Sequence, residues 1–138
     1  MKVLVSACLL GENCKYNGKN NYSQRVVDFV KDKEVVAICP ELLAGLPAPR
    51  PPVELVDGLV QDKAGNDLHK TYCGGVQLAV EQIRGLGVDV AILQSRSPTC
   101  GVKQIYDGTF TGRLIDGQGL FARALAEAGC KVLDAEDV

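Results

Sequence analysis

The sequence lacks several features that would assign it to a common class of protein. It has no Cys-x-x-Cys pair, so a zinc ribbon or a thioredoxin-like redox pair has no support. No apolar run approaches the roughly 20 residues of a membrane span, and residues 1–10 lack the basic segment and cleavage site of a signal peptide. The formal net charge is −2 with both signs interspersed, which gives no basic face for nucleic acid. We therefore expect one cytoplasmic domain, residues 1–138, without a membrane or nucleic-acid partner.

Six cysteines are present, and three of them follow apolar runs of strand length. In a cytoplasmic protein, thiols or metal ligands are expected in preference to disulfides. The runs at residues 2–7, 34–38 and 88–93 are rich in valine and isoleucine and too short for helices, which predicts three strands, of which 88–93 is expected to be buried. Cys8, Cys39 and Cys100 come after these runs, directly or through a short turn.

The position of these three cysteines relative to the strands predicts a site. The carboxyl ends of parallel strands meet at one edge of a sheet, where ligands bind, so the three thiols are expected to converge there. The alternative is a packing role, because free cysteine is a small and often buried hydrophobe. Packing alone would not favour one end of every strand.

The remaining pattern predicts an α/β fold with an open, mainly parallel, Rossmann-like sheet flanked by helices. Helices are expected from the cap at Ser23 to about residue 31, from residue 67 to 84 or 85, and over residues 120–128, with a last strand at 131–133. Asp57-Gly58 and Asp107-Gly108 each predict a small β-hairpin insertion. Gly74 and Gly75 inside the third segment suggest close packing against the sheet or against a bound group.

The segments that follow the predicted strands supply candidate site residues. The Gly- and Asn-rich loop at residues 9–21 contains Cys14, which is either a fourth ligand or a bystander, and Tyr16, which either lines a pocket or belongs to a plain turn. The proline-rich segment 40–52 holds Arg50 in a stiff stretch, poised for an anion or a carbonyl oxygen, unless it is a solvated surface residue.

The turn at residues 95–101 is the most polar of the strand ends. Pro98 ends the ladder because it has no backbone N–H, and Ser95, Ser97 and Cys100 are placed where a ligand would bind. Cys73 is expected on a helix, Cys130 at the opposite edge of the sheet, and the single histidine, His69, at the surface.

Three converging thiolates can hold a metal centre and leave one metal position without a protein ligand. For zinc this is the catalytic arrangement, in which water or substrate takes the fourth place. For a [4Fe-4S] cluster it leaves one iron open to a substrate atom. The absence of a usable histidine near the cysteines favours all-sulfur ligation and iron, with zinc as the second choice.

Several motifs together resemble the thiouracil desulfurase family, and the resemblance covers nearly the whole chain. The motifs are residues 6–11 (SACLLG), 16–18 (YNG), 39–41 (CPE), 45–47 (GLP), 49–52 (PRPP), 95–101 (SRSPTCG) and 105–110 (IYDGTF). The resemblance implies that Cys8, Cys39 and Cys100 hold a [4Fe-4S] cluster. It also implies that Glu41 and Ser97 assist the exchange of sulfur for oxygen on a small thiolated pyrimidine.

Other functions remain open at this point. A metal-binding or sulfur-carrier protein without turnover would share the three cysteines but would not need Glu41. A desulfidase of thiolated tRNA nucleosides would need a basic face, which the sequence lacks. A phosphate-binding domain that uses residues 95–101 as an anion cradle is weak, because no P-loop spacing exists.

Overall fold

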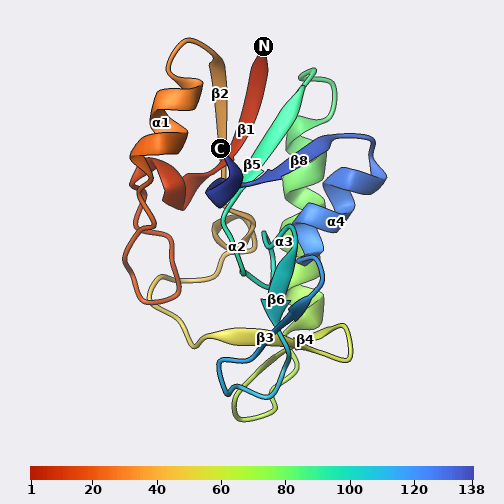
Figure 1. Cartoon of the computed structure of the whole chain (residues 1–138). Helices are drawn as coiled ribbons and strands as arrows, with labels where there is room; N and C mark the ends of the chain where they lie inside the picture. Colours follow the sequence, from red (N-terminus) through yellow and green to blue (C-terminus); the bar gives the residue numbers. More distant parts are fainter.

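A four-stranded parallel sheet forms the centre of the fold (Figure 1). The computed structural model describes all residues, 1–138. The strand order is β2 (Glu34–Ile38), β1 (Lys2–Ser6), β5 (Val90–Leu93) and β8 (Lys131–Asp134). Each neighbouring pair is parallel, so all four carboxyl ends lie at one edge. The predicted open, mainly parallel sheet is confirmed.

Helices cover both faces of the sheet because the buried strands present apolar side chains on both sides. On one face, Val3 and Val5 pack with α1 (Gln24–Val30). On the other, Leu4 and Leu93 pack with α3 (His69–Ile83) and α4 (Leu120–Glu127). The predicted cap of α1 is present, since Ser23 Oγ accepts a hydrogen bond of 3.3 Å from the Val26 backbone N–H. None of the helices is both long and apolar enough to span a bilayer.

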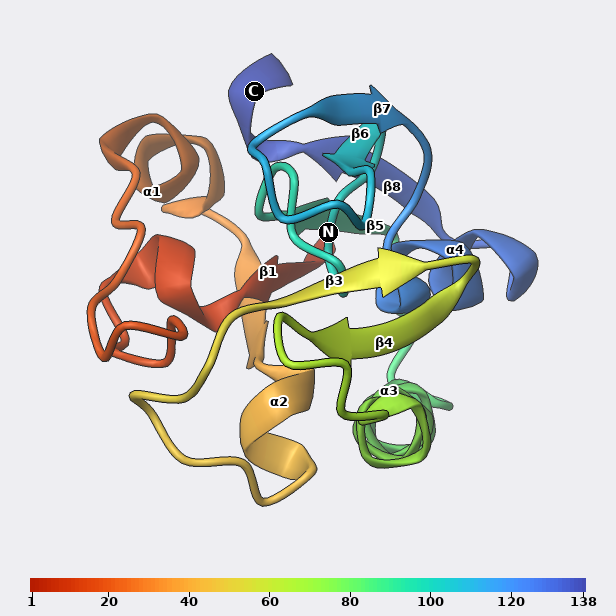
Figure 2. The same ribbon diagram turned by 90° about the horizontal axis from the view of Figure 1, so that it is seen from below.

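Short elements gather beyond the carboxyl edge of the sheet. They are the helices η1 (Ala7–Leu10), α2 (Pro40–Leu43) and η2 (Ala135–Asp137) and two antiparallel hairpins. The hairpins are β3 (Val53–Val56) with β4 (Leu59–Asp62), and β6 (Gln104–Tyr106) with β7 (Leu114–Asp116). Seen from below in Figure 2, the hairpins and α2 lie in front of the sheet strands. Together they cover the edge at which ligands bind in such folds.

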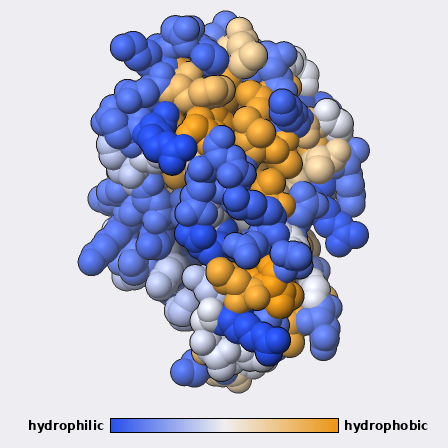
Figure 3. All heavy atoms as spheres, in the orientation of Figure 1, coloured by the Kyte–Doolittle hydropathy of each residue, from blue (hydrophilic) through white to orange (hydrophobic).

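Apolar side chains remain exposed on one side of the molecule (Figure 3). One apolar area lies over β5 and β8, and a second lies at the β6–β7 hairpin, where Leu114 and Ile115 are exposed. The helix α1 is only 7 residues long, so it covers only part of its sheet face.

One hairpin turn differs from the sequence prediction. Asp57 and Gly58 form the predicted two-residue turn, with φ of 51° and 80° as its left-handed geometry requires. The hairpin predicted around Asp107-Gly108 is confirmed as β6 with β7, but residues 107–113 connect the two strands as a longer loop. Gly108 instead donates its backbone N–H to Glu54 Oε1 at 2.9 Å, a contact between distant segments that a local motif does not encode.

The two helical glycines also differ from prediction. A Cβ added to Gly75 would lie 2.3 Å from the Pro40 carbonyl oxygen and 2.8 Å from the Ala44 Cβ. A Cβ added to Gly74 would meet nothing within 4 Å. The close packing partner is therefore α2, neither the sheet nor a bound group, and it involves Gly75 alone.

Candidate active site

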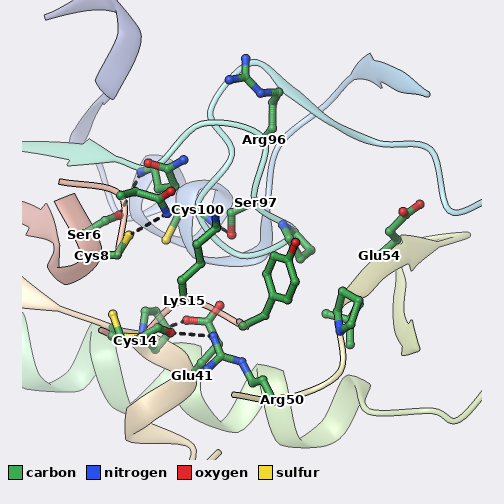
Figure 4. Close-up of a pocket in the computed structure, with 18 of the residues that line it drawn as sticks. Ser6, Cys8, Cys14, Lys15, Glu41, Arg50, Glu54, Arg96, Ser97 and Cys100 are labelled. Carbon is green, nitrogen blue, oxygen red and sulfur yellow. Dashed lines mark hydrogen bonds between the residues drawn. The ribbon is translucent and has the colours of Figure 1, made fainter. Parts of the chain in front are cut away.

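A cavity of about 710 Å³ lies at the carboxyl edge of the sheet (Figure 4). Four of the six cysteines line it: Cys8, Cys14, Cys39 and Cys100. Cys73 and Cys130 lie elsewhere, Cys73 on α3 and Cys130 immediately before β8. The three cysteines that follow the predicted strands therefore line one cavity, and Cys14, from the loop after η1, lines it as well.

The turn at residues 97–101 is fixed by the N-terminal end of α4. The backbone N–H groups of Leu120 and Phe121 donate to the carbonyl oxygens of Pro98 and Thr99, at 3.0 and 2.8 Å. Gly119 passes so close that a Cβ there would lie 2.4 Å from the Thr99 carbonyl carbon. These contacts make the turn an extension of the core and hold Cys100 in place.

Cys100 is buried, with 6% of the residue exposed. Burial raises its pKa well above the usual value, and the nearby charge of Glu41 raises it further. A thiol in this environment keeps its proton until a metal displaces it, because metal ligation requires the thiolate.

Cys8 and Cys14 both line the cavity, and Cys8 lies beside Cys100 in Figure 4. The pKa of Cys8 is lowered to about 7, first by its hydrogen bond with Cys14 and then, against the effect of burial, by the Asn21 amide. The Asn21 Nδ2 group donates to Cys8 Sγ at 3.5 Å. The pKa of Cys14 is raised by its hydrogen bonds to Cys39 and Cys8. The Cys14 thiol therefore lies close to two of the predicted ligands.

Glu41 reaches the cavity from the first turn of α2. Cys39 caps this helix and Pro40 occupies its first position, a local sequence that starts a helix directly after β2. Glu41 is 9% exposed. Its Oε1 accepts a hydrogen bond of 2.6 Å from Thr99 Oγ1, and its Oε2 accepts one of 3.4 Å from Cys39 Sγ. The carboxylate thus lies between two strand ends that carry predicted ligands.

The two serines of the turn have different hydrogen-bond partners. Ser97 Oγ accepts from the backbone N–H groups of Thr99 and Cys100, both at 3.1 Å, and its own O–H has no protein acceptor. The Ser95 hydroxyl donates to Asp134 Oδ1 at the end of β8. Both residues line the cavity, but only Ser97 has a proton available to donate into it.

Arg50 binds carbonyl oxygens, which is one of the two roles that the sequence allowed. Its Nη2 donates to the Cys14 carbonyl at 3.0 Å and its Nη1 to the Pro47 carbonyl at 3.1 Å. Its backbone N–H donates to the Tyr16 carbonyl at 2.7 Å. Arg50 therefore ties the proline-rich segment to the loop that carries Cys14 and Tyr16, and all three residues line the cavity.

Sequence reasoning missed several residues of the cavity wall. Tyr72, Tyr106 and Phe110 add aromatic surface to that of Tyr16. Glu54 holds the loop of Phe110, because its Oε1 accepts from the backbone N–H groups of Gly108 and Phe110 at 2.9 and 3.2 Å. Tyr106 and Phe110 belong to the motif at residues 105–110, whereas nothing in the local sequence of Glu54 and Tyr72 marks them as pocket residues.

The donor set fits an all-sulfur centre. Three thiols reach the cavity from separate strand ends, all six cysteines are free, and no histidine lines the cavity. His69 is half-buried, and its Nδ1 accepts from the Val60 backbone N–H at 3.3 Å. No three His, Cys, Asp or Glu side chains are arranged to hold a single metal ion. The cysteines of a four-iron cluster bind different irons, so their sulfurs stay farther apart than those around one ion.

Comparisons with known proteins agree with this assignment. The family model described as 2-thiouracil desulfurase matches residues 3–137. The chain is 34% identical over 146 residues to the uncharacterised protein YbbK of Bacillus subtilis (strain 168), covering 99% of this chain and 97% of that protein. It is also similar to the solved structure of TudS, a [4Fe-4S]-dependent thiouracil desulfidase. The TM-score is 0.92 at 33% identity, covering 99% of this chain and 92% of TudS. The chain belongs to the 2-thiouracil desulfurase family.

Proposed function

We propose that this protein is a [4Fe-4S]-dependent desulfidase that replaces the sulfur of a thiolated pyrimidine, such as 2-thiouracil, by oxygen. The observation that carries the proposal is the single cavity that gathers Cys8, Cys39 and Cys100 around Glu41 and Ser97. Membership of the family and the similarity to TudS support the reaction and the cofactor. The six free cysteines support a reducing, cytoplasmic location.

Cys8, Cys39 and Cys100 would hold the cluster as thiolates and leave one iron without a protein ligand. When bound, the cluster supplies a Lewis acid that polarises the carbon–sulfur bond of the substrate. Cys14 stays outside the ligand set in this proposal, because it lies in the loop after η1, whereas the three proposed ligands follow the ends of strands.

Glu41 handles protons in the proposed reaction. Its carboxylate lines the cavity and is held at Oε1 by Thr99, so Oε2 is the oxygen that serves as acid or base. Overall, a water oxygen forms a bond to the ring carbon and the carbon–sulfur bond breaks. The sulfur leaves as sulfide, which takes up the protons of the water. No electrons are gained or lost, so no external reductant is needed.

Ser97 orients the substrate in the proposed mechanism. Two backbone N–H groups fix its Oγ, so its free O–H points in a defined direction. A fixed hydroxyl can donate to a ring nitrogen or an exocyclic atom of a pyrimidine without losing side-chain entropy on binding.

The cavity wall favours a small heterocycle as substrate. Tyr16, Tyr72, Tyr106 and Phe110 supply flat apolar surface, which suits a planar ring. The net charge of −2 gives no electrostatic attraction for nucleic acid. We infer that the substrate is a small thiolated pyrimidine and that thiolated tRNA is not bound.

The proposal is tested with protein purified under anaerobic conditions. Iron and sulfide are counted per chain, and conversion of 2-thiouracil to uracil is followed. Glu41→Gln should keep the cluster but lose turnover by at least about 100-fold, the usual contribution of a general acid or base. Ser97→Ala should also keep the cluster and lose turnover, with Ser95→Ala as the milder matched control.

Two results would contradict the proposal. A fully loaded parent protein that converts no thiolated pyrimidine would be a metal-binding or sulfur-carrier protein. Normal turnover in Glu41→Gln, together with loss of cluster and activity in Cys100→Ser, would remove Glu41 from the mechanism.

A further inference from the structure

Thr99 connects the two residues to which we assign the proton transfer and the orientation of the substrate. It is 0% exposed and does not line the cavity, so it does not contact a ligand there. Its Oγ1 donates to Glu41 Oε1 at 2.6 Å, across 58 residues of sequence. Its backbone N–H donates to Ser97 Oγ at 3.1 Å. One buried residue therefore holds both Glu41 and Ser97.

The direction of the Thr99 hydroxyl is set by the core. The Thr99 carbonyl oxygen accepts from the backbone N–H groups of Phe121 and Ala122, at 2.8 and 3.3 Å. The close approach of Gly119 leaves no room for the Thr99 backbone to shift toward α4. The hydroxyl is therefore a preorganised donor, which positions the carboxylate more accurately than a mobile side chain would.

Cluster binding makes this contact more important. In the structure, Glu41 accepts hydrogen bonds from two side chains, Thr99 and Cys39. A cysteine binds metal as its thiolate, so Cys39 would lose the proton that it donates to Glu41 Oε2. Thr99 is then the one side-chain donor that remains, and a buried carboxylate depends strongly on such a charge-assisted bond.

We propose that Thr99 is a positioning residue that holds Glu41 Oε1 and thereby directs Oε2 into the cavity. The inference rests on the proposed role of Glu41 as proton donor and acceptor. Thr99 then affects catalysis only through Glu41.

The first test is a double-mutant cycle on the anaerobically purified, cluster-loaded protein with 2-thiouracil as substrate. Thr99→Val keeps the shape of the side chain and removes the hydroxyl. It should lower kcat by about 10- to 100-fold, as small misplacements of a catalytic group do, with KM and iron per chain unchanged. Thr99→Ser keeps the hydroxyl and should stay within about threefold of the parent.

The double-mutant cycle distinguishes a Thr99 that acts only by positioning Glu41 from a Thr99 that contributes to catalysis independently of Glu41. In a Glu41→Gln background, Thr99→Val should lower kcat by less than about twofold, because the residue it positions is already gone. Losses that multiply in the double variant would overturn the proposal. Equal kcat in Thr99→Val and the parent would overturn it as well.

A crystal structure of each loaded variant provides a readout that does not depend on turnover. The Glu41 carboxylate should be displaced in Thr99→Val and restored in Thr99→Ser. An unmoved carboxylate in Thr99→Val overturns the inference even if the parent protein proves inactive, in which case the proposed function fails separately. If Thr99→Val does not fold, recovery of folding and iron on adding Glu41→Gln supports the pairing, and continued failure refutes it.

Discussion

Two segments supply cysteines to the same cavity, but they are held in place differently. The turn at residues 97–101 is fixed by backbone hydrogen bonds from α4 and is largely buried. The loop at residues 11–22 is held partly by its own exposed amide side chains. Asn20 Nδ2 donates to Asn13 Oδ1, and the Lys19 backbone N–H donates to Asn17 Oδ1, both at 3.0 Å.

The site therefore has two parts: the turn at residues 97–101, which belongs to the core, and the loop at residues 11–22, which lies outside the core. Breaking a buried backbone hydrogen bond costs free energy, because a donor or acceptor left unpaired there has neither a protein partner nor water. Exposed side-chain bonds exchange with water at little cost. Changes in the turn should therefore damage fold and site together, whereas changes in the loop should alter the site alone.

The largest effect is expected from Gly119→Ala, which acts on the turn. The Gly119 backbone has φ −70° and ψ 166°, which alanine adopts without strain. The added Cβ, however, would lie 2.4 Å from the Thr99 carbonyl carbon and 2.8 Å from the Cys100 nitrogen. We expect a loss of about 2–3 kcal/mol in the free energy of unfolding, as for overpacked cores, and reduced iron per chain. Urea unfolding and iron analysis measure the two effects.

Gly74→Ala is the matched control for this substitution. Gly74 lies inside α3 and has open space where the Cβ would go. Alanine there should raise the free energy of unfolding by about 0.5–1 kcal/mol through helix propensity alone. If Gly119→Ala and Gly74→Ala were equally stable, the turn at residues 97–101 would not be tightly packed against Gly119.

The sequence predicts the parts of the molecule that depend on local patterns. Apolar runs predict β1, β2 and β5, although β2 is an edge strand with mostly exposed residues, and their order along the chain is sufficient for a parallel sheet. The rule that ligands bind at carboxyl ends then selected Cys8, Cys39 and Cys100, which the structure brings to one cavity. The family motifs added Glu41 and Ser97, whose roles remain predictions.

The contacts between distant segments could not be predicted in this way. The pairing of Ser95 with Asp134 and that of Thr99 with Glu41 depend on how strand ends meet in space. Gly75 allows α2 to approach α3, but the sequence shows only a glycine that weakens a helix. The sequence does not decide whether Cys14 is a ligand or a bystander, because a position in a loop does not fix the direction of a side chain.

A smaller effect is expected from Cys14→Ala, which acts on the loop. Cys14 interacts with Cys39 and Cys8, which raise its pKa, and it is not one of the proposed ligands. We expect unchanged iron per chain and a loss of less than about 1.5 kcal/mol in the free energy of unfolding, the net value of a hydrogen bond. Cys39→Ala, measured beside it, should lose the iron. Loss of iron in Cys14→Ala to the same extent would make Cys14 a fourth ligand and contradict the division between turn and loop.

The smallest effect concerns the reactivity of the cysteines in protein prepared without a cluster. The pKa of Cys8 is lowered to about 7, whereas burial raises that of Cys100. Because the thiolate is the form that reacts, the rate of Cys8 alkylation by iodoacetamide should rise with pH through a midpoint near 7. Cys100 should stay unmodified over the same range. Asn21→Ala removes a hydrogen bond to Cys8 Sγ and should move the Cys8 midpoint upward. Mass spectrometry of peptides from timed reactions measures both sites. If Cys100 reacts as fast as Cys8 at pH 7, the turn at residues 97–101 is not buried before the cluster binds. The packing of this turn would then depend on the metal.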